Sequence, residues 1–181
     1  MDGIIELVSN NCTFGVNSVI MNKRILFLIL LIGSMILASC EEDDICVGEG
    51  TPNLTVVFRN DFNTQNLKDT LTIYASNSID FENSYLLYDK VFSDSLKLPL
   101  GGLNEEIIYY KIQRRSNSVS DILTVNYQPT TEYVSKACGF RLTYEGLQYQ
   151  TTQNYINYLI PNESNELKDE TETDLYIVLS N

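Results

Sequence analysis

Hydrophobic and polar residues alternate along most of the chain after residue 53. In the first segment with this pattern the apolar side chains fall on one face, and they are Leu54, Val56 and Phe58. Alternation with a period of two is typical of a β-strand with one buried face. Residues 70–75 repeat the pattern, so we predict strands at 54–59 and 70–75. The polar segment 61–69 between them predicts a hairpin with a long loop.

Seven further segments combine β-prone residues with flanking clusters of Asn, Asp, Ser and Gly. The predicted strands are residues 85–91, 95–98, 106–113, 122–127, 138–144, 155–160 and 175–179. Within 106–113, residues 107–110 are apolar on both faces, which predicts a central strand, whereas the acidic stretch 162–174 predicts an exposed loop. About nine short strands without a long helix favour an all-β fold. We predict an antiparallel two-sheet sandwich, Ig-like or similar, with a small β-barrel as the alternative.

A different pattern occupies the N-terminal part of the chain. Lys23 and Arg24 precede an apolar run at 25–36, and small residues then lead to Cys40 and four acidic residues. This order is typical of a lipoprotein signal peptide. The run is well short of the roughly 20 residues that a membrane-spanning helix needs. We therefore predict cleavage before Cys40 and lipidation of its sulfur, with an ordinary buried thiol as the alternative.

These features predict four parts. Residues 1–20 resemble neither a signal nor a folded element, and because Met21 opens a standard signal peptide, we predict that they are an over-extended reading frame. Residues 21–39 are the predicted signal peptide, 40–52 a short acidic tether, and 53–181 a β-sandwich domain. The predicted location is the outer membrane, with the protein lipid-anchored on the periplasmic face or at the cell surface.

The composition excludes several classes of function. The formal net charge is −12, and removing residues 1–39 leaves it unchanged because that segment holds two basic and two acidic residues. Such a surface repels phosphate backbones, so we expect no nucleic-acid partner. Without histidine, the common zinc, copper and haem ligand sets are largely excluded, and Ser-His or Cys-His nucleophiles cannot be built. We expect no catalytic residues, no cofactor and no metal site, and a protein that is not an enzyme.

Once Cys40 carries lipid, two cysteines of the exported part remain, Cys46 and Cys138. In an oxidising compartment they predict a disulfide, with two separate buried thiols as the alternative. Five residues separate Cys40 from Cys46. Because an extended chain covers at most about 3.5 Å per residue, the disulfide would hold the domain within roughly 20 Å of the bilayer.

Other motifs have both a chemical and a plainer explanation. Ser135-Lys136 resembles a Ser-Lys dyad, and Glu105-Glu106 is a close acidic pair. Adjacent residues on a strand point to opposite faces, so neither pair is expected to act together. A bulged strand near Gly139 is the favoured explanation of the first motif. The many tyrosines of the second half suit either core packing or, on an exposed sheet, contact with sugar or protein.

Several segments together resemble a known family. They are Asp43-Asp44-Ile45-Cys46, then Thr51-Pro52 before a strand ending in Phe58-Arg59, and Val134-Ser135-Lys136-Ala137-Cys138-Gly139-Phe140. The chain resembles an uncharacterised lipoprotein family of Bacteroidota-type bacteria that carries a domain of unknown function. The resemblance implies export, lipidation and a disulfide-linked β domain, and it brings no activity.

The predicted function follows from these features. We expect an outer-membrane lipoprotein with a non-catalytic β domain that acts as an accessory or interaction subunit of the cell envelope. Its expected partners are the membrane, through the lipid anchor, and an envelope or outer-membrane protein. The alternative is a surface module that binds glycan or peptide.

Overall fold

The computed structural model describes residues 46, 50–62, 65–114 and 119–180. Cys40, the predicted signal peptide and residues 1–20 lie outside this part of the chain. The described residues form ten strands and no helix. The strands are β1 (Leu54–Asn60), β2 (Asp69–Ser76), β3 (Tyr85–Ser93), β4 (Ser95–Leu98), β5 (Ile107–Arg114), β6 (Ser120–Ser135), β7 (Gly139–Thr151), β8 (Ile156–Pro161), β9 (Glu166–Leu167) and β10 (Leu175–Leu179). Among these residues no helix is long and apolar enough to cross a bilayer.

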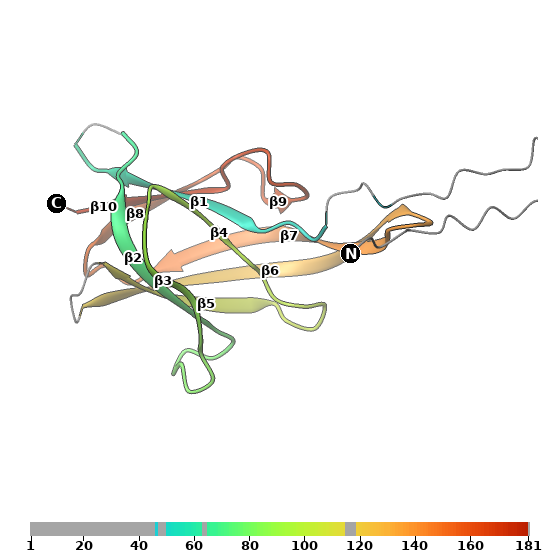
Figure 1. Ribbon diagram of the computed structural model, residues 1–181, viewed down its shortest axis with the longest axis horizontal. Helices are drawn as coiled ribbons and strands as arrows, with labels where there is room; N and C mark the ends of the chain where they lie inside the picture. Colours follow the sequence, from blue (N-terminus) through green and yellow to red (C-terminus); the bar gives the residue numbers. More distant parts are fainter. Residues whose placement is uncertain (1–45, 47–49, 63–64, 115–118, 181) are drawn as a thin grey trace, which may run out of the picture. The chain divides into compact units, whose positions relative to one another are not determined.

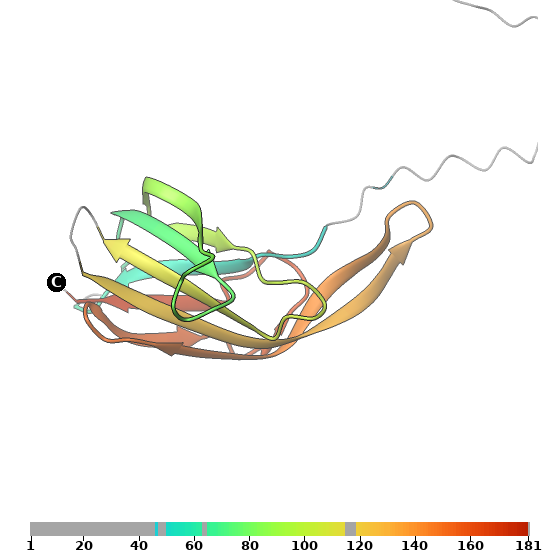
Figure 2. The same cartoon turned by 90° about the horizontal axis from the view of Figure 1, so that it is seen from below.

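The strands form two sheets that face each other (Figure 1). One sheet has four strands in the order β4-β1-β10-β8, and the other has six in the order β3-β2-β5-β6-β7-β9. The six-stranded sheet curls, as Figure 2 shows, so the sandwich approaches a half-open barrel. The predicted all-β, two-sheet fold is confirmed. Its described strand pairs are antiparallel except β1 with β10, which run parallel with Val56 opposite Leu175.

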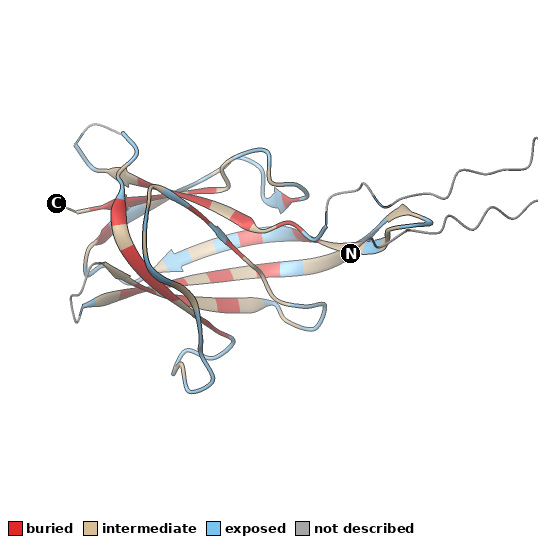
Figure 3. Cartoon of the chain, viewed as in Figure 1, coloured by how far each residue is buried: buried red, intermediate tan, exposed pale blue. Residues whose placement is uncertain are grey.

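Alternating side chains of both sheets build the core between them, and buried positions recur along the strands in Figure 3. The largest fully buried side chains are Tyr110, Tyr144, Phe58, Leu54, Leu71, Ile73, Leu98, Ile108, Ile112, Leu123, Ile156 and Leu167. β5 lies between β2 and β6, as expected for a central strand. The predicted period-two alternation therefore gives the correct buried face of these strands.

Three buried tyrosines form hydrogen bonds with the backbone of the segment between β4 and β5. The Tyr110 hydroxyl donates to the Pro99 carbonyl at 2.6 Å, and the Tyr144 hydroxyl donates to the Gly101 carbonyl at 3.0 Å. The Tyr127 hydroxyl accepts from the Gly101 N–H at 2.8 Å, and its ring meets that of Tyr144 edge to face. Burial raises the pKa of Tyr127 to about 12, so its hydroxyl stays protonated at neutral pH. Tyr110 and Tyr144 thus belong to the core, whereas Tyr127, although almost fully buried, also borders a surface groove.

Two predictions about the arrangement are wrong. β1 and β2 do not form a hairpin, because β1 belongs to the four-stranded sheet and β2 to the six-stranded one. The stretch 162–174 is not simply an exposed loop, since β9 pairs with β7 and Leu167 is buried. An alternating pattern identifies the buried face of a strand and does not identify its neighbour.

Candidate functional site

The β6–β7 hairpin extends beyond the rest of its sheet. β5 pairs with β6 only as far as Asn126, and β9 pairs with β7 at Tyr144 and Glu145. No other described strand pairs with residues 128–143, which we call the arm. The arm projects past the two sheets in both views (Figures 1 and 2). Without a third strand beside it the tip of the arm is largely exposed, whereas Leu142 and Thr143 at its base pack against the rest of the domain.

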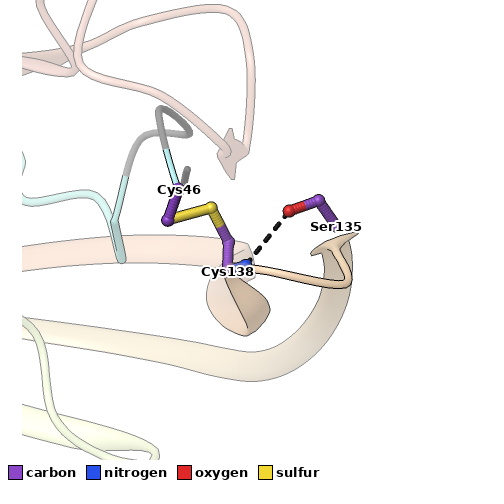
Figure 4. The surroundings of a disulfide bond; sticks show 3 residues. All are labelled: Cys46, Ser135 and Cys138. Carbon is purple, nitrogen blue, oxygen red and sulfur yellow. Dashed lines mark hydrogen bonds between the residues drawn. A yellow bond between two sulfur atoms is a disulfide. The ribbon is translucent and has the colours of Figure 1, made fainter. Parts of the chain in front are cut away.

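The disulfide lies at the tip of the arm (Figure 4). Cys138 ends the turn at 136–138 and is bonded to Cys46, with the two Cα atoms 4.9 Å apart. The Ser135 hydroxyl oxygen accepts a hydrogen bond from the Cys138 N–H at 3.0 Å. Gly139 follows with φ of 71°, a conformation that favours glycine, and the strand register shifts beside it. The structure thus contains both the predicted disulfide and the predicted bulge.

A second contact joins the N-terminal segment to the arm. The Thr51 hydroxyl oxygen accepts a hydrogen bond from the Leu142 N–H at 3.2 Å. Cys46 is thus bonded to Cys138, and Thr51, further along the chain, contacts Leu142, which lies further along, in β7. Among the described residues, the N-terminal segment therefore contacts the arm before the chain enters β1.

The paired motifs that suggested catalysis do not form a reactive site. The Ser135 hydroxyl is engaged by the turn, and Lys136 is exposed. The Glu105 carboxylate accepts hydrogen bonds from the Gly102 N–H and the Asn77 side chain, which stabilises the loop before β5. Within the described ranges, no group of three or more Cys, Asp or Glu residues is placed to hold a metal ion.

The faces of the arm differ in character. On one face Tyr133 and Phe140 are cross-strand partners, with ring centroids 5.4 Å apart in an edge-to-face arrangement. Their exposed fractions are 54% and 72%. On the other face Arg141 donates to the Glu132 carboxylate at 2.8 and 3.0 Å. The arm is therefore an amphipathic hairpin with an exposed aromatic pair.

A second apolar surface lies on the side of the four-stranded sheet that faces away from the core. We call it the outer patch, and its residues are Val57, Arg59, Tyr158, Ile160, Tyr176 and Val178. The guanidinium carbon of Arg59 lies 3.4 Å from the centre of the Tyr176 ring. Tyr158 and Ile160 are exposed, whereas Val57 and Val178 are buried beneath their neighbours. Tyrosine, arginine and aliphatic side chains are the usual components of a protein contact.

A shallow groove of about 450 Å³ lies beside the beginning of β5 and the middle of β6 and β7. Polar side chains contribute much of its lining, including Asn126, Gln128 and Gln148. Amide groups both donate and accept hydrogen bonds, and Glu106 adds a carboxylate, so this groove suits a polar ligand with hydrogen-bond donors.

The acidic residues before β10 mostly bond within the protein. Glu170 accepts hydrogen bonds from Asn53 and pairs with Lys97, and Asp169 accepts from Thr171. Asp174 accepts from the Thr55 N–H at 2.7 Å, at the junction of β1 and β10. Burial raises the pKa of Asp174 to about 6, and the repulsion of the nearby carboxylates adds to this effect.

Asp174→Asn should stabilise the protein at neutral pH. The folded chain retains a proton on Asp174 between the ordinary pKa of 3.8 and about 6, so this group lowers stability as pH rises through that window. The asparagine oxygen still accepts from Thr55 and carries no charge. After allowance for solvent screening, we expect a gain of about 1 kcal/mol at pH 7. Urea unfolding at several pH values measures this gain, and a gain that persists undiminished below pH 4 would contradict the explanation.

Comparison with known proteins adds a family. Residues 70–179 match a family of unknown function, DUF6452. The chain belongs to this family. The DUF6452 match includes the arm and Cys138, and it leaves out β1 and Cys46. No curated protein and no solved structure matches the chain.

The expected membership of a family with a domain of unknown function is therefore confirmed. The Bacteroidota-type source of this chain and its lipoprotein character stay predictions. The functional feature that the sequence did not reveal is the arm. β6 continues to Ser135, beyond the predicted 122–127, because the polar residues near the tip break the alternating pattern. β7 continues to Thr151, beyond the predicted 138–144 and away from the tip.

Proposed function

We propose that this DUF6452 chain is an outer-membrane lipoprotein, acylated at Cys40, whose non-catalytic β domain is an accessory or interaction subunit of the cell envelope. The observation that supports this most strongly is the position of the disulfide. Cys46 follows Cys40 by six residues and is bonded to the tip of the arm. A lipid on Cys40 would therefore lie near the arm tip, where the disulfide crosslinks the chain before it continues into β1.

The geometry changes the expected distance between the domain and the membrane. The five residues between Cys40 and Cys46 hold the arm tip within roughly 20 Å of the bilayer. The β6 side of the arm, residues 128–135, adds roughly 24 Å at about 3.4 Å per residue. With the arm upright, the two sheets would lie well beyond the headgroups. In this proposal the arm is a spacer, and the sequence-based expectation of a wholly close-docked domain applies only to its tip.

The outer patch supplies the proposed contact with an envelope or outer-membrane protein. It combines the exposed Tyr158 and Ile160 with the Arg59–Tyr176 stack. Aromatic and arginine side chains contribute most of the binding energy in many protein interfaces. A partner in the same membrane would contact this surface at the distance from the bilayer that the length of the arm determines.

Binding of a glycan or peptide at the cell surface is the second candidate function. The groove lined by Asn126, Gln128 and Gln148 favours it, because amide groups pair well with hydroxyl and peptide groups. Chemical cross-linking of intact envelopes separates the two proposals. A stoichiometric membrane-protein partner supports the first, and retention on a polysaccharide resin supports the second.

Cys40→Ala should abolish membrane attachment of the full-length chain. The wild-type protein should incorporate a labelled fatty acid and sediment with the membranes, because several acyl chains on one cysteine give stable anchoring. The variant should carry no label and remain in the supernatant. Cys12→Ala is the matched control, and it should behave like the wild type because translation is predicted to start at Met21. A wild-type protein without label, or a C40A protein that stays in the membrane, would disprove the anchor.

A further inference from the structure

We propose that the aromatic pair Tyr133 and Phe140 is a second membrane contact, which inserts into the headgroup region of the lipid bilayer beside the anchor. This inference rests on the proposed function, because acylation of Cys40 is what brings the arm tip to the membrane. It deepens that function by assigning an orientation to the domain, with the arm tip down and the two sheets away from the lipid.

The exposure of the pair supports this assignment. Phe140 is 72% and Tyr133 is 54% exposed, although each ring already contacts the other. The described residues therefore leave both rings largely uncovered. A tyrosine ring is apolar with a polar tip, and such side chains are enriched where membranes meet water.

The charge of the arm also fits a lipid surface. The chain as a whole carries a net charge of −12, which would repel phosphate headgroups. The arm has one acidic residue, Glu132, and two basic residues, Lys136 and Arg141. Glu132 is paired with Arg141 on the polar face, and Lys136 is exposed in the turn. The arm itself is therefore not repelled by an anionic or zwitterionic headgroup, whereas residues 41–44 of the adjoining tether are acidic.

The position of the disulfide places the pair close to the anchor. Cys138 lies between Tyr133 and Phe140 along the hairpin, two residues from the second and five from the first. The tether from Cys40 to Cys46 spans at most roughly 20 Å. The aromatic face is thus the exposed apolar surface that the chain itself connects most directly to the acylated cysteine.

The absence of tryptophan from the chain allows a direct test. Phe140→Trp introduces a single fluorescent reporter at the tip of the full-length, processed protein. The matched control is Phe62→Trp, whose site is 82% exposed and follows β1 at the end away from Thr51 and the arm (Figure 1). Each protein is reconstituted in phosphatidylcholine vesicles whose acyl chains carry bromine near the headgroup. Tyr133→Trp serves as a second reporter in the same experiment.

We expect F140W and Y133W to lose most of their fluorescence in brominated vesicles and to shift to shorter wavelength, while F62W is unchanged. Equal fluorescence of F140W, Y133W and F62W would overturn the membrane contact. The mass of the same preparation reports acylation of Cys40 separately. An acylated protein with unquenched reporters therefore disproves the aromatic contact alone, and an unacylated protein disproves the anchor whatever the reporters show.

Discussion

Replacing Cys46 and Cys138 together with alanine should lower the free energy of unfolding by about 4 kcal/mol. The disulfide joins residues 92 positions apart, so it encloses the chain from before β1 to the end of β6. In the unfolded state the crosslink removes many conformations, and a long loop gives a large effect. Urea unfolding of the oxidised wild type and the double variant measures the difference.

Reduction supplies the control for this experiment. Wild-type protein in reductant should unfold at the same urea concentration as the double variant, and the variant itself should not respond to reductant. If the oxidised wild type unfolds like the reduced one and shows two free thiols when denatured, the disulfide is absent from the protein and the tether is not joined to the arm.

Asp121→Ala should cost about 3 kcal/mol of stability, because it removes a buried acceptor of four hydrogen bonds. One oxygen of this fully buried carboxylate accepts from the Thr152 hydroxyl at 2.6 Å and the Asn154 N–H at 2.8 Å. The other accepts from the Tyr155 and Ile156 N–H groups, each at 2.9 Å. A single side chain at the start of β6 thus positions the chain where it leaves one sheet and enters the other.

The charge state of Asp121 adds a pH signature. Burial acts against ionisation, and the hydrogen bonds from Thr152 and the following N–H groups outweigh it, so the pKa of Asp121 lies below its ordinary value. Its contribution is present at neutral pH and is lost as pH falls through the lowered pKa. The difference in the free energy of unfolding between wild type and D121A should therefore become smaller in acid.

Thr124→Ala is the matched control for D121A. Thr124 is half-buried on the same strand and faces away from the core, so its loss should change stability by less than about 0.5 kcal/mol. Equal stabilities of D121A and T124A in urea unfolding at pH 7 would contradict the assigned role of the carboxylate.

The sequence predicted the parts of the fold that depend on local alternation. Leu54, Val56 and Phe58 are buried on one face as expected, and the apolar run at 107–110 lies in a central strand. Cys46 and Cys138 could be paired by elimination, because Cys40 had another expected role. These features are visible from the sequence because each is decided by residue type and spacing alone.

The remaining features depend on contacts between distant segments. The parallel pairing of β1 with β10 and the separation of β1 from β2 follow from the packing of two sheets, which alternation does not encode. The β6 side of the arm was hidden because Thr130, Thr131 and Glu132 interrupt the apolar pattern after Tyr127. The outer patch likewise forms only when β1, β8 and β10 become neighbours.

One peptide carries the central claim that a lipidated N-terminus is tied to the arm. Trypsin cleaves after lysine and arginine, so the processed protein should release residues 40–59 joined through Cys46 to residues 137–141 through Cys138. Mass spectrometry without reduction should find this pair with acyl groups on Cys40, and reduction should separate it. A peptide that begins before Cys40, or one in which Cys40 is unmodified, would contradict the account.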